Sequence, residues 1–128
     1  MAEHEPDAVR IAGPELGAVA LATAASLESG LPFVIVRKEA KGYGTAKQLE
    51  GIYEEGELVC LVEDVVTTGG AALEAVEVLR NAGLRVSTAV CVVDREEGGV
   101  DEFARHAVRL RPLFRASELL EIPANPHG

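Results

Sequence analysis

The sequence predicts an α/β domain in which helices flank a mainly parallel sheet. Apolar, β-branched runs of strand length alternate with segments of helical periodicity along the 128-residue chain. One apolar run, which starts at Leu58, ends in two carboxylates, and the turn Thr-Thr-Gly-Gly follows before a helical pattern begins. Open sheets of this class bind ligands beyond the carboxyl ends of their strands, so the same observations predict where a site lies.

The composition limits the class of protein. Apolar residues make up 48% of the chain and charged residues 26%, which is typical of a globular protein, and the length suits a single domain over residues 1–128. No apolar run reaches the length of a membrane span and the N-terminus does not resemble a signal peptide, so we expect a cytoplasmic protein without membrane contact. A net charge of −9 argues against nucleic-acid binding. Cys60 and Cys91 lie in apolar runs, where we expect reduced, buried thiols.

In the first part of the chain we expect a strand over residues 9–12 and a turn over residues 13–17. The helix predicted over residues 19–27 is rich in alanine and almost uncharged, which indicates burial on both sides. A second strand follows over residues 33–36.

Residues 39–57 contain several glycines and many charges. We expect a long loop there, of the kind that often forms a lid. The alternative is a pair of short hairpin strands near residues 48–53.

In the second part, the strand from Leu58 leads through the turn into a helix that continues to Asn81, with apolar residues at helical spacing. The elements expected after it are a strand, a short helix, a strand and a helical turn capped by Ser117, over residues 85–93, 100–106, 107–110 and 116–121.

The turn after the central strand has the features of an anion site. Gly69 and Gly70 permit positive φ and a close approach of a ligand to the backbone. The N–H groups at the start of the following helix attract an anion such as phosphate. Thr67 and Thr68 add hydroxyl donors, and we expect them to cap this helix.

Glu63 and Asp64 precede this turn and indicate a second half of the ligand. Two carboxylates repel a phosphate but suit the hydroxyls of a sugar, alone or with a metal ion nearby. Ribose phosphate matches both halves. The turn has neither the ending of a Walker loop nor the Gly-x-Gly-x-x-Gly pattern of dinucleotide-binding folds. The alternative is an ordinary turn between strand and helix with surface acids.

Basic residues gather at another strand end. Arg37, Lys38, Lys41 and Lys47 follow the second strand within one short segment, so the local charge is positive although the chain is acidic. The loops at the expected carboxyl ends of strands cover residues 13–17, 37–47, 63–71 and 94–99. Because parallel strands bring these ends to one edge of the sheet, we expect a single site there.

The central stretch consists of four apolar residues, two acids, two apolar residues and Thr-Thr-Gly-Gly. It resembles the phosphoribosyl pyrophosphate (PRPP) signature of the type I phosphoribosyltransferases. Within that family, residues 13–17, 37–44 and 93–99 look most like orotate phosphoribosyltransferases, and the resemblance extends from about residue 9 to about residue 122. It implies the type I fold and transfer of phosphoribosyl from PRPP to orotate. The products are orotidine 5′-phosphate and pyrophosphate, in de novo pyrimidine (UMP) biosynthesis.

The resemblance also implies roles for single residues. Glu63 and Asp64 would act in catalysis by holding the ribose hydroxyls, and residues 13–17 would approach the pyrophosphate through backbone N–H groups. Mg²⁺ is the implied cofactor, held mainly by PRPP and by no direct protein ligand. The 5′-phosphate would lie against Val65, Val66, Thr67, Thr68, Gly69, Gly70 and Ala71.

Four residues after the second strand would bind the pyrophosphate end of PRPP, namely Arg37, Lys38, Lys41 and Tyr43. Lys38 and Lys41 would act in catalysis, because they neutralise the charge that develops as pyrophosphate leaves. Tyr43 stands where many members of the family have histidine. In the family a lysine of this loop reaches the neighbouring subunit, which implies a homodimer with residues 38–47 at the partner's site.

Arg95 would bind the carboxylate of orotate through its guanidinium, and Thr67 would lie near the base. PRPP and orotate are thus the expected partners. Family members usually carry an N-terminal segment of several tens of residues that helps to cover the base. Here the first strand is expected near Val9, so this hood is largely absent.

Two alternatives to the orotate enzyme stay open, a phosphoribosyltransferase for another base and a non-catalytic protein that senses PRPP or nucleotides. Intact Arg37, Lys38 and Lys41 favour catalysis over sensing, and Arg95 favours orotate over bases without a carboxylate. Arg95 could instead be a surface arginine paired with Glu96 or Glu97.

Overall fold

The computed structural model describes residues 7–15, 17–38 and 48–120. Its centre is a six-stranded sheet in the order β3-β2-β1-β4-β5-β6, and every neighbouring pair is parallel except β2 and β3. The strands are β1 (Arg10–Pro14), β2 (Phe33–Val36), β3 (Leu49–Glu50), β4 (Leu58–Val66), β5 (Arg85–Asp94) and β6 (Arg109–Arg115). The helices are α1 (Val19–Ser29), α2 (Gly70–Asn81), α3 (Gly99–Arg105) and α4 (Ala116–Leu120).

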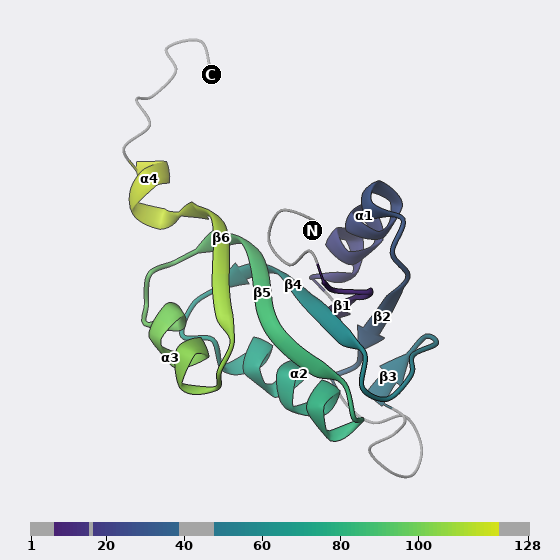
Figure 1. Ribbon diagram of the computed structural model, residues 1–128. Helices are drawn as coiled ribbons and strands as arrows, with labels where there is room; N and C mark the ends of the chain where they lie inside the picture. The colour runs from purple at the N-terminus through teal and green to yellow at the C-terminus, as the bar shows by residue number, and fades with distance from the viewer. Residues whose placement is uncertain (1–6, 16, 39–47, 121–128) are drawn as a thin grey trace.

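Helices cover both faces of the sheet (Figure 1). α1 contacts β1, β2 and β4 on one face, while α2 and α3 lie on the opposite face against the strands from β2 to β6. The alternating order of elements and the parallel pairing confirm the predicted fold class, a mainly parallel α/β sheet flanked by helices. Within the described residues, no helix is long and apolar enough to cross a membrane.

The main core lies between the sheet and α2. Leu73, Val76 and Leu79 form the buried side of α2 and belong to one apolar cluster with Val59 and Leu61 of β4. The helical spacing of these residues and the continuous apolar run of β4 place both surfaces where they exclude water together. This packing fixes the start of α2 relative to the end of β4.

The two cysteines behave as the sequence predicts. Cys60 and Cys91 are buried in the strands and form no disulfide with each other. Burial raises the pKa of the Cys91 thiol to about 12, so this group stays protonated near neutral pH.

The burial expected on both sides of α1 is wrong. Ala22 is fully buried and packs in a cluster with Ile11 and Val62, whereas Leu27 on the same helix is 82% exposed. Alanine side chains offer little apolar area, so an alanine-rich helix gains little by burying its whole circumference. α1 covers the sheet with one side only.

β1 is longer than predicted, because Gly13 and Pro14 extend the strand and pair with the end of β2. A Cβ atom at Gly13 would lie 2.8 Å from the Cβ of Ala22, so glycine allows α1 to approach the strand closely. β1 begins at Arg10.

The segment expected as a long loop contains a strand. The alternative of two short hairpin strands near residues 48–53 is confirmed for one strand, β3. This strand pairs antiparallel with β2 and not with a second strand of the same segment. Residues 39–47 lie outside the described residues, with Lys41, Tyr43 and Lys47 among them, and the lid stays a prediction.

The last elements also differ from the prediction. β6 begins at Arg109 because Ala107 adopts a positive φ of 60° in the turn after α3. Ser117 does not cap α4, which already begins at Ala116; instead the Ser117 N–H donates to Oε1 of Glu96, 21 residues earlier. No local pattern indicates an acceptor so far away.

Two leucine-to-alanine variants test this packing. Leu79 has no exposed surface, so Leu79→Ala should lower the free energy of unfolding by about 2–5 kcal/mol. Leu27→Ala, at an 82% exposed position, should change it by about 0.5 kcal/mol or less. Urea unfolding followed by circular dichroism measures both values. Equal losses would contradict the burial described for α1 and α2.

Candidate active site

The strand order reverses between β1 and β4, because β1 is followed by β2 on one side and β4 by β5 on the other. In open parallel sheets, ligands bind at the carboxyl ends of the strands beside such a reversal. A cavity of about 110 Å³ lies at this edge. It is lined by Pro14, Glu15, Val36, Arg37, Lys38, Gln48, Glu63, Ala71, Glu74, Ala75 and Val78.

Arg37 and Lys38 line this cavity from the end of β2, and contacts from neighbouring segments fix their backbone. The Arg37 N–H donates to the carbonyl oxygen of Gln48 at 2.7 Å, and the Lys38 N–H donates to Oε1 of Glu15 at 2.8 Å. The Arg37 guanidinium pairs with Glu50, yet its buried Nε has no hydrogen-bond acceptor among the described residues. A buried donor without an acceptor is costly, so a partner for this group has to come from outside the described residues.

Glu63 and Asp64 lie near the end of β4 but do not close it, because Val65 and Val66 continue the strand and pair with β5. The Asp64 N–H donates to Oε1 of Glu63 at 3.0 Å, and the Val65 N–H donates to Oδ1 of Asp64 at 2.7 Å, so both carboxylates are held against the backbone. A Cβ atom at Gly17 would lie 2.5 Å from Oδ2 of Asp64. Glycine at this position therefore leaves the space that the Asp64 carboxylate occupies.

The two carboxyl groups differ in acidity. Burial, followed by the hydrogen bond with Asp64, raises the pKa of Glu63 to about 7. The same hydrogen bond lowers the pKa of Asp64. Near neutral pH Glu63 is therefore protonated for part of the time, while Asp64 is ionised. A ligand that donates hydrogen bonds to both carboxylates favours the fully ionised pair.

Glu63→Gln should flatten the pH dependence of stability. The folded protein holds the Glu63 proton more tightly than the unfolded chain does between the ordinary pKa of 4.5 and the raised pKa of about 7. The contribution of Glu63 to stability is therefore largest below the ordinary pKa and is lost as the pH rises through the raised pKa. Urea unfolding from about pH 5 to about pH 8 should show a larger loss in the parent than in the variant. Parallel profiles would contradict this assignment; the charge-matched control is Glu28→Gln, on α1.

The turn before α2 has the predicted glycine conformation but different capping. Gly69 is the N-cap of α2, with a φ of 98°, and no side chain caps the helix. Thr67 and Thr68 are exposed, so the expectation that they cap α2 is wrong. The positive φ of Gly69 lets the chain turn into α2 without a threonine cap. The first N–H groups of α2 therefore stay open to an anion, and its first turn carries no acidic residue.

Arg95 follows β5 at the same edge of the sheet. Its N–H donates to the carbonyl oxygen of Val66 at 2.9 Å, which ties it to the end of β4. Its side chain is 58% exposed, and the guanidinium Nε lies 3.7 Å from a carboxylate oxygen of Glu97. This geometry matches the alternative of a paired surface arginine, and the role in orotate binding stays a prediction.

The donor set fits a magnesium ion only in part. The described residues contain no group of three or more His, Cys, Asp or Glu side chains that could hold a metal. Mg²⁺ in sites for phosphorylated substrates takes one or two carboxylates, water and substrate oxygens. Glu63 and Asp64 could supply such carboxylates, so most ligands would have to come from the substrate.

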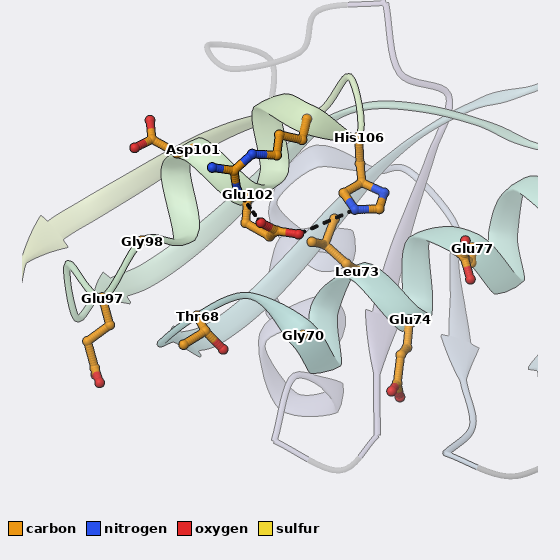
Figure 2. A pocket seen from close by; sticks show the side chains of 11 residues that line it. Thr68, Gly70, Leu73, Glu74, Glu77, Glu97, Gly98, Asp101, Glu102 and His106 are labelled. Atoms are coloured by element: carbon orange, nitrogen blue, oxygen red, sulfur yellow. Dashed lines mark hydrogen bonds and ion pairs between the residues drawn. The ribbon is translucent and has the colours of Figure 1, made fainter.

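A larger cavity that the sequence did not indicate lies between α2 and α3 (Figure 2). Its volume is about 570 Å³, and acidic side chains predominate in its lining. Figure 2 shows Glu102 directed toward the His106 ring, with 3.6 Å between Oε1 and Nε2. Thr68 and Gly70 of the turn before α2 line this cavity too, so a phosphate at that turn would lie at its edge. Because carboxylates predominate in the rest of its lining, the smaller cavity beside Arg37 and Lys38 is the better candidate for the rest of a phosphorylated substrate.

Comparison with known proteins shows the family of the chain. Residues 3–111 match the family described as Phosphoribosyl transferase domain. The chain is 55% identical over 111 residues to the orotate phosphoribosyltransferase of Methanocella arvoryzae, a match that covers 87% of this chain and 63% of that protein. The chain thus spans less than two thirds of this relative's length.

Two solved structures share the fold. The orotate phosphoribosyltransferase from Aeropyrum pernix superimposes with a TM-score of 0.83 at 35% identity, over 94% of this chain and 70% of that chain. The orotate phosphoribosyltransferase of Mycobacterium tuberculosis H37Rv in complex with PRPP gives a TM-score of 0.77 at 33% identity, over 88% of this chain and 66% of that chain. These matches confirm the family that the central stretch and its three companion segments predict.

Proposed function

Because this chain belongs to the phosphoribosyltransferase domain family, we propose that it transfers the phosphoribosyl group of PRPP to orotate and forms orotidine 5′-phosphate and pyrophosphate. The observation that supports this most strongly is the shared cavity: Arg37 and Lys38 from β2 and Glu63 from β4 line it together where the strand order reverses. The choice of orotate follows the names of the relatives.

The site suits the three parts of PRPP. The 5′-phosphate binds the N–H groups at the start of α2 and the hydroxyls of Thr67 and Thr68, from residues 65–71. The ribose hydroxyls donate to Glu63 and Asp64. The pyrophosphate lies toward Arg37, whose buried Nε is without an acceptor among the described residues, and toward Lys38. Lys41 and Tyr43 complete this end of the site in the proposal.

The protein contributes charge stabilisation to this reaction and no nucleophilic side chain, because the base itself is the nucleophile. The bond between C1′ of the ribose and the pyrophosphate oxygen breaks, and its electron pair leaves with pyrophosphate. A ring nitrogen of orotate forms the new bond to C1′, and the proton of its N–H group is lost to water or to the departing pyrophosphate. Arg37, Lys38 and Lys41 stabilise the negative charge that develops on the leaving group. Glu63 and Asp64 orient the ribose and stabilise the positive charge on its ring.

Mg²⁺, where it is bound, adds positive charge to the pyrophosphate end, held mainly by PRPP oxygens. Arg95 pairs with the orotate carboxylate through two parallel hydrogen bonds, and Thr67 contacts the base. The same proposal includes a homodimer, in which residues 38–47 reach the neighbouring site, and a cytoplasmic location.

The second candidate is a phosphoribosyltransferase for another base. The Arg95 side chain is 58% exposed and its Nε lies near Glu97, so the side chains described around it do not enclose a carboxylate. A base without a carboxylate would need no such partner.

A spectrophotometric assay of orotate consumption with PRPP and Mg²⁺ tests the proposal. Uracil, hypoxanthine and adenine are run beside orotate. We expect turnover with orotate and not with the other bases. Turnover with another base supports the second candidate, and PRPP binding without any turnover supports a sensing protein.

Amide variants of the acidic pair test the placement of PRPP. Asp64→Asn and Glu63→Gln keep the shape of each side chain but remove the charge that strengthens hydrogen bonds from ribose hydroxyls. Near pH 8, where both carboxyls are ionised, PRPP affinity by calorimetry should fall at least about tenfold in the double variant. Glu77→Gln combined with Glu28→Gln is the charge-matched control and should bind as the parent does. Unchanged affinity in the double variant would remove the pair from the site.

Arg95→Ala tests the choice of base. A bidentate pair with a carboxylate contributes roughly 1.5–3 kcal/mol, so kcat/KM for orotate should fall by about tenfold to a hundredfold. PRPP affinity should not change, because the phosphate turn follows a different strand. A variant that consumes orotate as fast as the parent would contradict orotate recognition by Arg95.

A further inference from the structure

The backbone that carries Arg95 is strained at the next residue. Glu96 has a φ of 61°, and Ala107 is the other non-glycine position with a positive φ in the described part of the chain. A glutamate in this region is uncommon, because its Cβ crowds the backbone. Such conformations persist where the surroundings enforce them, and they concentrate at functional sites.

Three hydrogen bonds enforce this conformation. The Arg95 N–H donates to the Val66 carbonyl oxygen at 2.9 Å, and the Glu96 N–H donates to Oδ1 of Asp94 at 2.9 Å. Asp94 is 2% exposed, so its carboxylate is a fixed acceptor within the fold. The third bond comes from α4, where the Ser117 N–H donates to Oε1 of Glu96 at 2.8 Å.

The bond from α4 is the long-range member of this set. The first N–H groups of a helix have no partner within the helix, so the Glu96 carboxylate satisfies one that would otherwise need water. The hydrogen bonds from Ser117 lower the pKa of Glu96, so the carboxylate is ionised at neutral pH. Glu96 thereby connects the loop after β5 to the element after β6.

The side chain of Arg95 has little else to hold it. It is more than half exposed, and its recorded side-chain partner is Glu97 at 3.7 Å. The backbone of residues 94–96 therefore fixes where this side chain begins, and so which positions its guanidinium can reach. A recognition side chain that is displaced by about 1 Å loses much of its effect on the reaction.

We propose that Glu96 is a positioning residue for Arg95. Its carboxylate, bonded to Ser117 of α4, holds residue 96 in the left-handed conformation and so directs the Arg95 guanidinium toward the base. This inference rests on the proposed function, in which Arg95 binds the carboxylate of orotate.

Two substitutions at one position separate positioning from stability. Glu96→Gly removes the acceptor but relieves the strain of positive φ, so the fold should be at least as stable as in the parent. Glu96→Gln keeps an acceptor for the Ser117 N–H. A merely structural role would leave the glycine variant as active as the parent.

Steady-state kinetics with both substrates provide the test. In Glu96→Gly, kcat/KM for orotate should fall by about tenfold, while KM for PRPP stays at the parent value. Glu96→Gln should stay within about twofold of the parent, because the acceptor is retained. Ser117→Pro removes the donor from the other side of the bond, in the first turn of α4 where an N–H has no partner within the helix, and should reproduce the loss. Glu28→Ala on α1 is the charge-matched control and should match the parent.

The inference is overturned by a Glu96→Gly variant that consumes orotate as the parent does, by an equal loss in Glu96→Gln, or by an equal rise in KM for PRPP. If one of these two variants folds poorly, the other still tests the bond, because Ser117→Pro removes its donor and Glu96→Gly removes its acceptor. A parent that binds PRPP but consumes no orotate contradicts the proposed function itself. That result differs from an active parent whose variants are equally active.

Discussion

The site depends on one constraint, the parallel pairing of β1 with both β2 and β4. Parallel strands deliver their carboxyl ends to the same edge, and the reversal of order between β1 and β4 sends the following segments apart. This arrangement places the basic end of β2 and the acidic end of β4 around one cavity. The buried side of α2 against β4 then fixes the phosphate turn beside it. Without this register, residues far apart in the chain would not share a site.

Charge is distributed to match that geometry. The chain carries a net charge of −9, yet Arg37 and Lys38 stand at the cavity beside an acidic pair whose pKa values move in opposite directions. The groove between α2 and α3 is larger but acidic, so its size does not make it a site for a polyanion. Cavity volume and chemistry therefore point to different places, and for a phosphorylated substrate the chemistry decides.

Local signals explain what the sequence could predict. The apolar run of β4, the two carboxylates and the two glycines lie within one stretch, so strand, turn and helix follow from neighbouring residues. Contacts between distant residues leave no such signal, and the Glu15–Lys38 and Glu96–Ser117 bonds appear only in the structure. The same reason explains the errors. Threonine and serine often cap helices, but Gly69 is the N-cap of α2, and the Glu96 carboxylate accepts a hydrogen bond from the first turn of α4. The alanine content of α1 did not indicate which side of that helix packs against the sheet.

The most direct test of the central claim is a crystal structure of the protein with PRPP and Mg²⁺. We expect the 5′-phosphate against the backbone N–H groups at the start of α2, with the ribose hydroxyls within hydrogen-bonding distance of Glu63 and Asp64. The pyrophosphate should lie toward Arg37 and Lys38. PRPP whose pyrophosphate lies among the carboxylates between α2 and α3, with the edge beside β1 and β4 left empty, would contradict this placement.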